Sequence, residues 1–194
     1  MLPKHNKPRN ALPTRSRCDM TNSGPERRPD GIRVCLADYA NARHASALVA
    51  LLDAYARDPM GGGEPLSDFA RHNLVHELAK LPQAFSLLAF DGEGEGEDSA
   101  VGLANCMQGF STFACKPLVN VHDLTVSAAY RGRRIGERLL LEVERVARQR
   151  GACKVTLEVL SGNPALRLYV RRGFAPYQLD PASGQAAFMQ KWLD

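Results

Sequence analysis

The chain has 194 residues, of which 44% are hydrophobic, and its formal net charge is +4. This length and composition suit one domain with a packed core. The sequence contains no run of 18 or more apolar residues, which argues against a membrane span. Its five cysteines are odd in number and lack C-x-x-C spacing. We therefore expect no disulfide framework and no zinc ribbon, and the pattern favours a reducing, cytoplasmic location.

Residues 1–30 differ in composition from the rest of the chain. They hold seven Lys or Arg against three acids, which accounts for the whole formal charge of +4, and they include five prolines. We interpret this segment as a disordered basic tail, and residues 31–194 as one domain. No apolar stretch follows the basic residues, so a secretory signal is not indicated. A basic tail attracts nucleic acid without sequence specificity, and we expect no specific nucleic-acid partner.

The first part of the domain is predicted to hold one strand and two helices. The expected elements are a strand at 32–37, a helix at 39–57 capped by Asp38, and a helix at 69–81 capped by Ser67 or Asp68. Pro59 and the run Gly61–Gly63 separate the helices. His72 and His76 have the spacing of a metal pair on one helix face, but no third ligand lies at a suitable distance. Solvated helix histidines and no metal site are the prediction.

The remaining apolar runs predict a series of strands. They are expected at 84–90, 100–110, 119–126, 153–160 and 186–193. The last is expected to form a hairpin with the segment after Phe174, through a turn at 181–184. The acidic, Gly-rich stretch 91–98 is predicted to be a solvated loop.

The stretch 119–141 changes from the period of a strand to that of a helix. Alternation fails at His122-Asp123, which indicates a bulge in the strand. From Ile135 the apolar residues recur at three- and four-residue spacing, with charged residues between them. The junction between strand and helix, residues 131–136, is therefore the candidate site.

The junction has the features of an anion-binding site. The first amides of a helix have no partner within it and carry the positive end of the helix dipole. Gly132 and Gly136 let the main chain approach a ligand closely. Arg131, Arg133 and Arg134 add guanidinium groups that suit phosphate oxygens. The alternative interpretation is a helix cap with solvated arginines.

Two blocks of sequence resemble the GNAT superfamily of N-acetyltransferases. The first is 131–136, where Arg131 and Gly136 match the ends of the family's pyrophosphate motif and Arg134 stands in place of its central Gly. The second is the strand 153–160 followed by Asn163, Ala165, Leu168-Tyr169 and Gly173-Phe174. In this second block the interval from Asn163 to Tyr169 is one residue shorter than in the commoner family pattern.

The resemblance implies a fold and a set of site residues. The fold is α/β (α+β), with a mixed central sheet of about six to seven strands that splays between the fourth and fifth, and about four flanking helices. The implied co-substrate is acetyl-coenzyme A. Its binding residues would be Leu124, Thr125, Val126, Arg131, Gly132, Arg133, Arg134, Ile135, Gly136, Glu137 and Asn163. Tyr169 would protonate the departing thiolate, and His122 or Asp123 would deprotonate the amine that attacks.

The implied activity is transfer of an acetyl group to a primary amine of a small molecule, such as a polyamine or an amino acid, within a ternary complex. A short likeness at residues 109–113 points toward the diamine acetyltransferase branch. A protein lysine or N-terminus is an alternative acceptor, and a non-catalytic module that senses acyl-coenzyme A is a third interpretation. An exposed final strand would be compatible with a homodimer.

Overall fold

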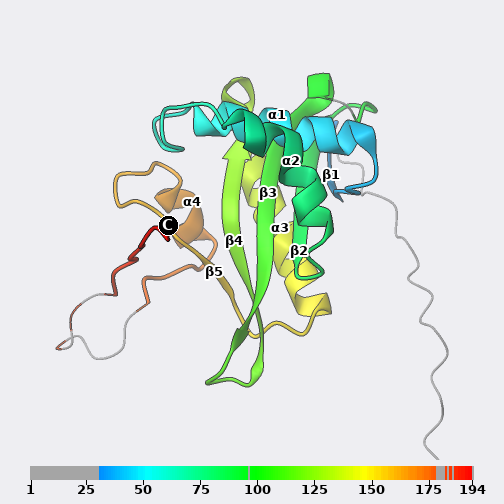
Figure 1. Cartoon of the computed structure of the whole chain (residues 1–194). Helices are drawn as coiled ribbons and strands as arrows, with labels where there is room; N and C mark the ends of the chain where they lie inside the picture. The colour runs from blue at the N-terminus through cyan, green and yellow to red at the C-terminus, as the bar shows by residue number, and fades with distance from the viewer. Residues whose placement is uncertain (1–30, 96, 178–181, 183, 185, 194) are drawn as a thin grey trace, which may run out of the picture.

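The computed structural model describes residues 31–95, 97–177, 182, 184 and 186–193. In this part of the chain, five strands form one sheet and four α-helices flank it (Figure 1). The strands are β1 (Ile32–Leu36), β2 (Ala84–Asp91), β3 (Ala100–Ser111), β4 (Lys116–Val126) and β5 (Val155–Leu157). The helices are α1 (Ala42–Ala56), α2 (Asp68–Ala79), α3 (Ile135–Gln149) and α4 (Leu166–Arg171).

The sheet is mixed, as the sequence predicted. Its strand order is β1-β2-β3-β4-β5, with antiparallel pairing from β1 to β4 and parallel pairing between β4 and β5. Antiparallel neighbours can be joined by short turns, whereas a parallel pair needs a crossover. Helix α3 supplies that crossover, so the junction at 131–136 lies at the end of β4.

The sheet carries a separate apolar cluster on each face. Helices α1 and α2 cross one face and α3 covers the other (Figure 1). On the α3 face, Leu139 and Val143 pack against Ala104 and Cys106 of β3. On the opposite face, Leu48 and Leu51 of α1 pack with Leu88 and Leu103. Successive strand residues point to opposite faces, which is why the nearly continuous apolar runs of β2 and β3 contribute to both clusters.

The helix caps differ in part from the prediction. Helix α1 begins at Ala42, three residues after the predicted start, because Asn41 rather than Asp38 accepts the hydrogen bond of the first turn, from the amide of Arg43 at 2.9 Å. The amide of Asp38 instead donates to Nδ1 of His44, and its carboxylate accepts from the amide of Ala40. The predicted Ser67 cap of α2 is confirmed by a 3.1 Å hydrogen bond from the amide of Ala70.

The strand count is five among the described residues, whereas six to seven were predicted. The predicted strand 153–160 is shortened to Val155–Leu157, because β4 pairs with it only opposite Val119–Val121. The two strands then diverge, as the predicted splay requires. The predicted strand 186–193 is wrong for this structure, since these residues form no strand and Trp192 is 85% exposed.

Two further predictions concern parts of the chain that are incompletely described. The basic segment 1–30 lies outside the described residues, as do residues 181 and 183 of the predicted turn.

Within the described residues, no helix is long and apolar enough to cross a bilayer.

Leu139 and Leu141 provide a matched test of the packing of α3. Leu139 is fully buried against the sheet, whereas Leu141, two residues later, is 39% exposed. We expect Leu139→Ala to lower the free energy of unfolding by about 2–5 kcal/mol, because it leaves a cavity in the core. Leu141→Ala should lower it by less than about 1 kcal/mol. Urea unfolding measures both, and equal losses would contradict the packing described here.

Candidate active site

Strand β4 has a bulge at the position where the sequence pattern fails. Asp123 is paired with Asn105 of β3, whereas Val121 is paired with the next residue, Cys106. His122 is therefore the additional residue, and the predicted irregularity is confirmed. A bulge changes the direction of the neighbouring side chains. As a result His122 is exposed and lines a cavity, while Asp123 is half-buried and accepts a hydrogen bond from Asn105.

The loop between β4 and α3 turns through two residues in the left-handed region. Gly132 has φ 83° and Arg134 has φ 60°. Arg134 stands where the family motif has Gly, so an arginine adopts here a conformation that favours glycine. This conformation allows α3 to begin at Ile135, directly after Arg134.

The amides at the start of α3 point out of the helix. The amide of Arg138 is the first in α3 to bond back along the helix, to the carbonyl of Arg134 at 3.1 Å. The amides of Ile135, Gly136 and Glu137 therefore precede the hydrogen-bond ladder of α3. They form the positive end of a 15-residue helix, which is a favourable place for an anion.

The arginines of the junction have different surroundings. Arg131 and Arg134 line the cavity. Arg131 is also held by Asp58, at 2.8 Å, and by the carbonyl of Val126, at 3.2 Å. Arg133 lies over the ring of Tyr130, with 4.7 Å from its guanidinium carbon to the ring centroid, and is not among the cavity-lining residues.

A cavity of about 680 Å³ joins the junction to the bulge. It follows β4 from Val121 to Val126, passes the start of α3, and is closed on its other side by the end of β5 and by α4. Most of the predicted site residues line it: His122, Leu124, Thr125, Val126, Arg131, Gly132, Arg134, Ile135, Gly136, Glu137, Asn163 and Tyr169. Asp123 and Arg133 lie outside this lining.

Tyr169 on α4 is 7% exposed and forms part of the cavity wall. Burial raises the pKa of its phenol to about 12, and Tyr55 adds to the effect. The phenol therefore stays protonated at neutral pH and can donate a hydrogen bond or a proton. Asn163, also predicted for cofactor binding, accepts a 2.9 Å hydrogen bond from the amide of Ala165 and shapes the turn before α4.

Residues from the end of α1 complete the cavity, and the sequence analysis did not include them in the site. Tyr55, Asp58 and Met60 line it. The hydrogen bond from Arg131 holds the pKa of Asp58 below its ordinary value. The sequence carries only an indirect signal for these residues. The glycines that follow Asp58 predicted a loop, but they did not indicate which of its side chains would reach the cavity.

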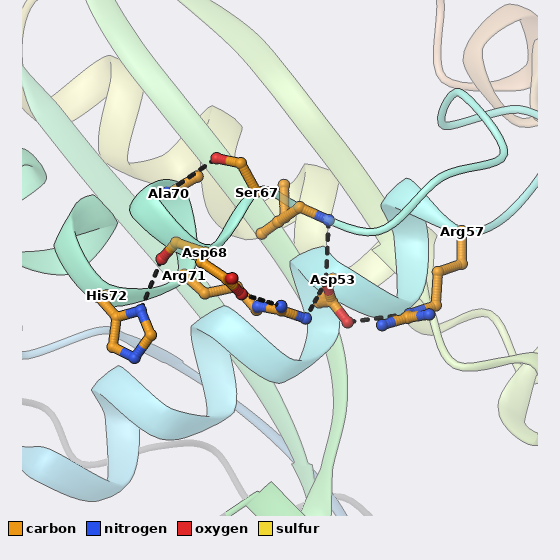
Figure 2. A network of polar contacts seen from close by, with 8 residues as sticks. Asp53, Arg57, Ser67, Asp68, Ala70, Arg71 and His72 are labelled. Atoms are coloured by element: carbon orange, nitrogen blue, oxygen red, sulfur yellow. Dashed lines mark hydrogen bonds and ion pairs between the residues drawn. The ribbon is translucent and has the colours of Figure 1, made fainter.

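A polar network holds this loop against the two helices (Figure 2). The carboxylate of Asp53 on α1 accepts from Arg57 at 3.0 Å and from the amide of Leu66 at 2.9 Å, and Arg71 of α2 lies 3.7 Å away. Burial alone would raise the pKa of Asp53, but its hydrogen bonds with Arg57 and Leu66 lower it instead. Both ends of the loop are therefore tied to Asp53.

Comparison with known proteins agrees with this geometry. Solved structures of acetyltransferases share the fold. A probable acetyltransferase has a TM-score of 0.68 at 20% identity, covering 84% of this chain and 99% of the other. An aminoglycoside acetyltransferase from an uncultured soil metagenomic sample, in complex with sisomicin, has a TM-score of 0.63 at 16% identity, covering 84% and 97%. Identities this low show the fold alone.

The sequence comparisons identify the family. The model of the acetyltransferase (GNAT) family matches residues 48–174, and the chain belongs to this family. Streptothricin acetyltransferase from Streptomyces lavendulae is 38% identical over 124 residues, which are 56% of this chain and 66% of that protein. The match thus spans slightly less than two thirds of the relative.

The left-handed residue Arg134 can be tested by substitution. Arg134→Ala keeps the Cβ atom and its steric cost, whereas Arg134→Gly removes both. We expect the Gly variant to be more stable than the Ala variant by about 1 kcal/mol, measured by urea unfolding. Equal stability of the two variants would show that position 134 does not adopt this conformation in solution.

Proposed function

We propose that this protein is an acetyl-coenzyme A dependent N-acetyltransferase that acts on a primary amine of a small cationic molecule. The observation that carries the proposal is the single cavity that runs from the amides of Ile135–Glu137, along β4, to His122 and Tyr169. It brings an anion site, an open strand edge and two proton-transferring side chains into one continuous space. Acetyl-coenzyme A is the co-substrate used by the family, and no metal is proposed.

The cofactor-binding role follows from the two ends of this space. The amides of Ile135, Gly136 and Glu137 would bind the pyrophosphate, with Arg134 supplying a guanidinium group beside them. Between Leu124 and Val126, β4 lies beyond its ladder with β5. Arg131 already donates to the carbonyl of Val126, so the backbone of Leu124 and Thr125 is the part proposed to bind the amide groups of the pantetheine arm, much as a peptide adds to a strand edge.

The reaction needs a base and an acid. An alkylamine has a pKa of about 10.4 and must lose a proton before its nitrogen can attack. His122 in the cavity and Asp123 at the bulge are the proposed bases. Attack forms the C–N bond and breaks the C–S bond, the nitrogen releases its second proton to solvent, and the departing thiolate takes a proton from Tyr169. The raised pKa of Tyr169, about 12, keeps the phenol protonated at neutral pH, so that it can donate to the departing sulfur.

The cavity wall carries three carboxylates, on Asp58, Glu137 and Glu158, and three arginines, Arg131, Arg134 and Arg171. Asp58 is paired with Arg131 and Glu137 with Arg171, whereas Glu158 and Asp123 accept hydrogen bonds from the neutral side chains of Asn120 and Asn105. These last two carboxylates would attract an amine with several positive charges. Two of the similar proteins are named for streptothricin and for aminoglycosides, both of which carry amino groups. We therefore propose acceptors of these two kinds, ahead of the simple polyamines and amino acids.

Calorimetry with coenzyme A, followed by a thiol-release assay over a panel of amines, tests the proposal. The panel should contain streptothricin, aminoglycosides, polyamines, single amino acids and a lysine peptide. We expect binding of coenzyme A, and we expect turnover to be fastest with streptothricin or the aminoglycosides. Absence of heat with the cofactor would overturn the proposed activity, and a preference for the peptide would overturn the proposed acceptor class.

Tyr169→Phe tests the proposed acid directly. We expect kcat to fall about 100-fold, because the thiolate loses its proton donor, while the Kd for coenzyme A stays within twofold. Tyr177→Phe is the matched control, since Tyr177 is 64% exposed and lies outside the cavity. Unchanged kcat in the Tyr169 variant would assign the aromatic ring to packing, including its edge-on contact with Phe174.

A further inference from the structure

We propose that Asn105 is a positioning residue that orients the carboxylate of Asp123 toward the acceptor amine, at the end of a polar row that crosses the sheet. This inference rests on the proposed function and deepens it, because it selects Asp123 as the base. The row consists of Tyr39, Ser86, Asn105 and Asp123, and we refer to these four residues as the polar row.

The register of the sheet aligns the polar row. Ser86 of β2 is paired with Asn105 of β3, and Asn105 is paired with Asp123 of β4. Paired residues on neighbouring antiparallel strands lie on the same face. Leu103, two residues before Asn105, belongs to the cluster beneath α1, so the polar row also lies on the α1 face. Tyr39 reaches it from the segment between β1 and α1.

The hydrogen bonds of the polar row have a defined direction. Asn105 donates from Nδ2 to Oδ2 of Asp123 at 3.0 Å, since a carboxylate can only accept. Its Oδ1 therefore faces Ser86, whose hydroxyl donates to it at 2.6 Å. The single proton of that hydroxyl is then in use, so the hydroxyl of Tyr39 donates to Ser86 at 2.9 Å. Each donor in the row points toward Asp123.

The burial of the polar row is difficult to explain by stability alone. Ser86 is 1% exposed and Asn105 is 3% exposed, and their neighbours on the same face, Leu88 and Leu103, are fully buried and apolar. Replacing both members of a buried hydrogen-bonded pair with apolar residues is often neutral for stability. The two polar residues therefore point to a role beyond packing, and that role lies at the end of the row, where Asp123 meets the bulge.

The contact with Asn105 leaves one carboxylate oxygen available. Oδ2 of Asp123 is occupied, so Oδ1 is the atom that can accept a proton from the acceptor. Thr125, two residues after Asp123 and on the same face of β4, lines the cavity, so Asp123 stands next to the cavity wall. Burial raises the pKa of Tyr55 and that of Cys106, and the charge of Asp123 adds to both effects.

In the resulting step, the acceptor ammonium gives one proton to Oδ1 of Asp123. The freed nitrogen forms the C–N bond as the C–S bond breaks, it releases its second proton to solvent, and the thiolate takes its proton from Tyr169. Solvent then removes the proton from Asp123 and returns one to Tyr169, which restores the enzyme.

Two substitutions of Asn105 separate positioning from structure. Asn105→Leu removes the donor to Asp123, and Asn105→Asp keeps the size but places a second carboxylate against the first. The leucine variant should lower kcat, because the carboxylate of Asp123 loses the donor that fixes its direction. The aspartate variant should lower kcat as well, since two neighbouring carboxylates repel each other.

Carbon-13 NMR of the free protein reports the surroundings of the Asp123 carboxyl, with Asp123→Asn used to assign the signal. We expect the chemical shift of this carboxyl to differ from that of the wild type in both Asn105 variants. This readout does not require turnover, so it remains informative if the proposed function fails. With an accepted amine, kcat of the leucine variant should fall about 10- to 100-fold while the Kd for coenzyme A is unchanged.

Ser86→Ala serves as the matched control for burial. It removes a buried hydroxyl at the neighbouring position but leaves the Asn105 donor next to Asp123, so its kcat should fall less than that of Asn105→Leu. The inference is overturned if the chemical shift of the Asp123 carboxyl is the same in wild type, Asn105→Leu and Asn105→Asp, or if the variants lose only thermal stability. Failure of the wild type to turn over any amine would overturn the proposed function instead.

Discussion

The candidate site depends on the point at which β4 and β5 separate. Their parallel ladder has three residue pairs, ending at Val121 and Leu157, while β4 continues to Val126. Beyond that point β4 is paired on its β3 side only, so the chain has an open strand edge inside the domain. Backbone donors and acceptors at such an edge need partners, and a ligand with amide groups can supply them. The cavity, the anion site and Tyr169 are all arranged around this edge.

The bulge assigns different surroundings to two adjacent polar side chains. In a regular strand, His122 and Asp123 would simply point to opposite faces. The additional residue instead leaves His122 on the cavity, while Asp123 stays in register with Asn105 and joins a hydrogen-bonded row across the α1 face. The α3 face beneath is apolar and packs closely. Tyr169 belongs to that α3-side cluster, whereas Asp123 lies on the α1 face, so the groups of the proposed chemistry come from both faces of the sheet.

Some charged side chains around the cavity are available for a ligand, and others hold the protein's own loops in place. Arg134 has a left-handed backbone conformation directly before the first residue of α3, and it lines the cavity. Arg131 lines it too, but its guanidinium also holds Asp58, which connects the cofactor side to the loop after α1. That loop is in turn held by Asp53 (Figure 2). The proposed cofactor and acceptor regions therefore share a wall fixed by ion pairs.

Local patterns in the sequence determined most elements of the fold. The change of period at 119–141 predicted β4, the junction and α3, and the irregularity at His122-Asp123 predicted the bulge, because these features depend on residues close together in the chain. The resemblance of residues 131–174 to a family predicted the splay. Tertiary structure alone decided that β5 is short, that residues 186–193 form no strand with the described part of the chain, and that Tyr55 and Asp58 reach the cavity. It also decided which face Asp123 shares with Asn105 and Ser86, since register between distant strands is set by packing rather than by local pattern.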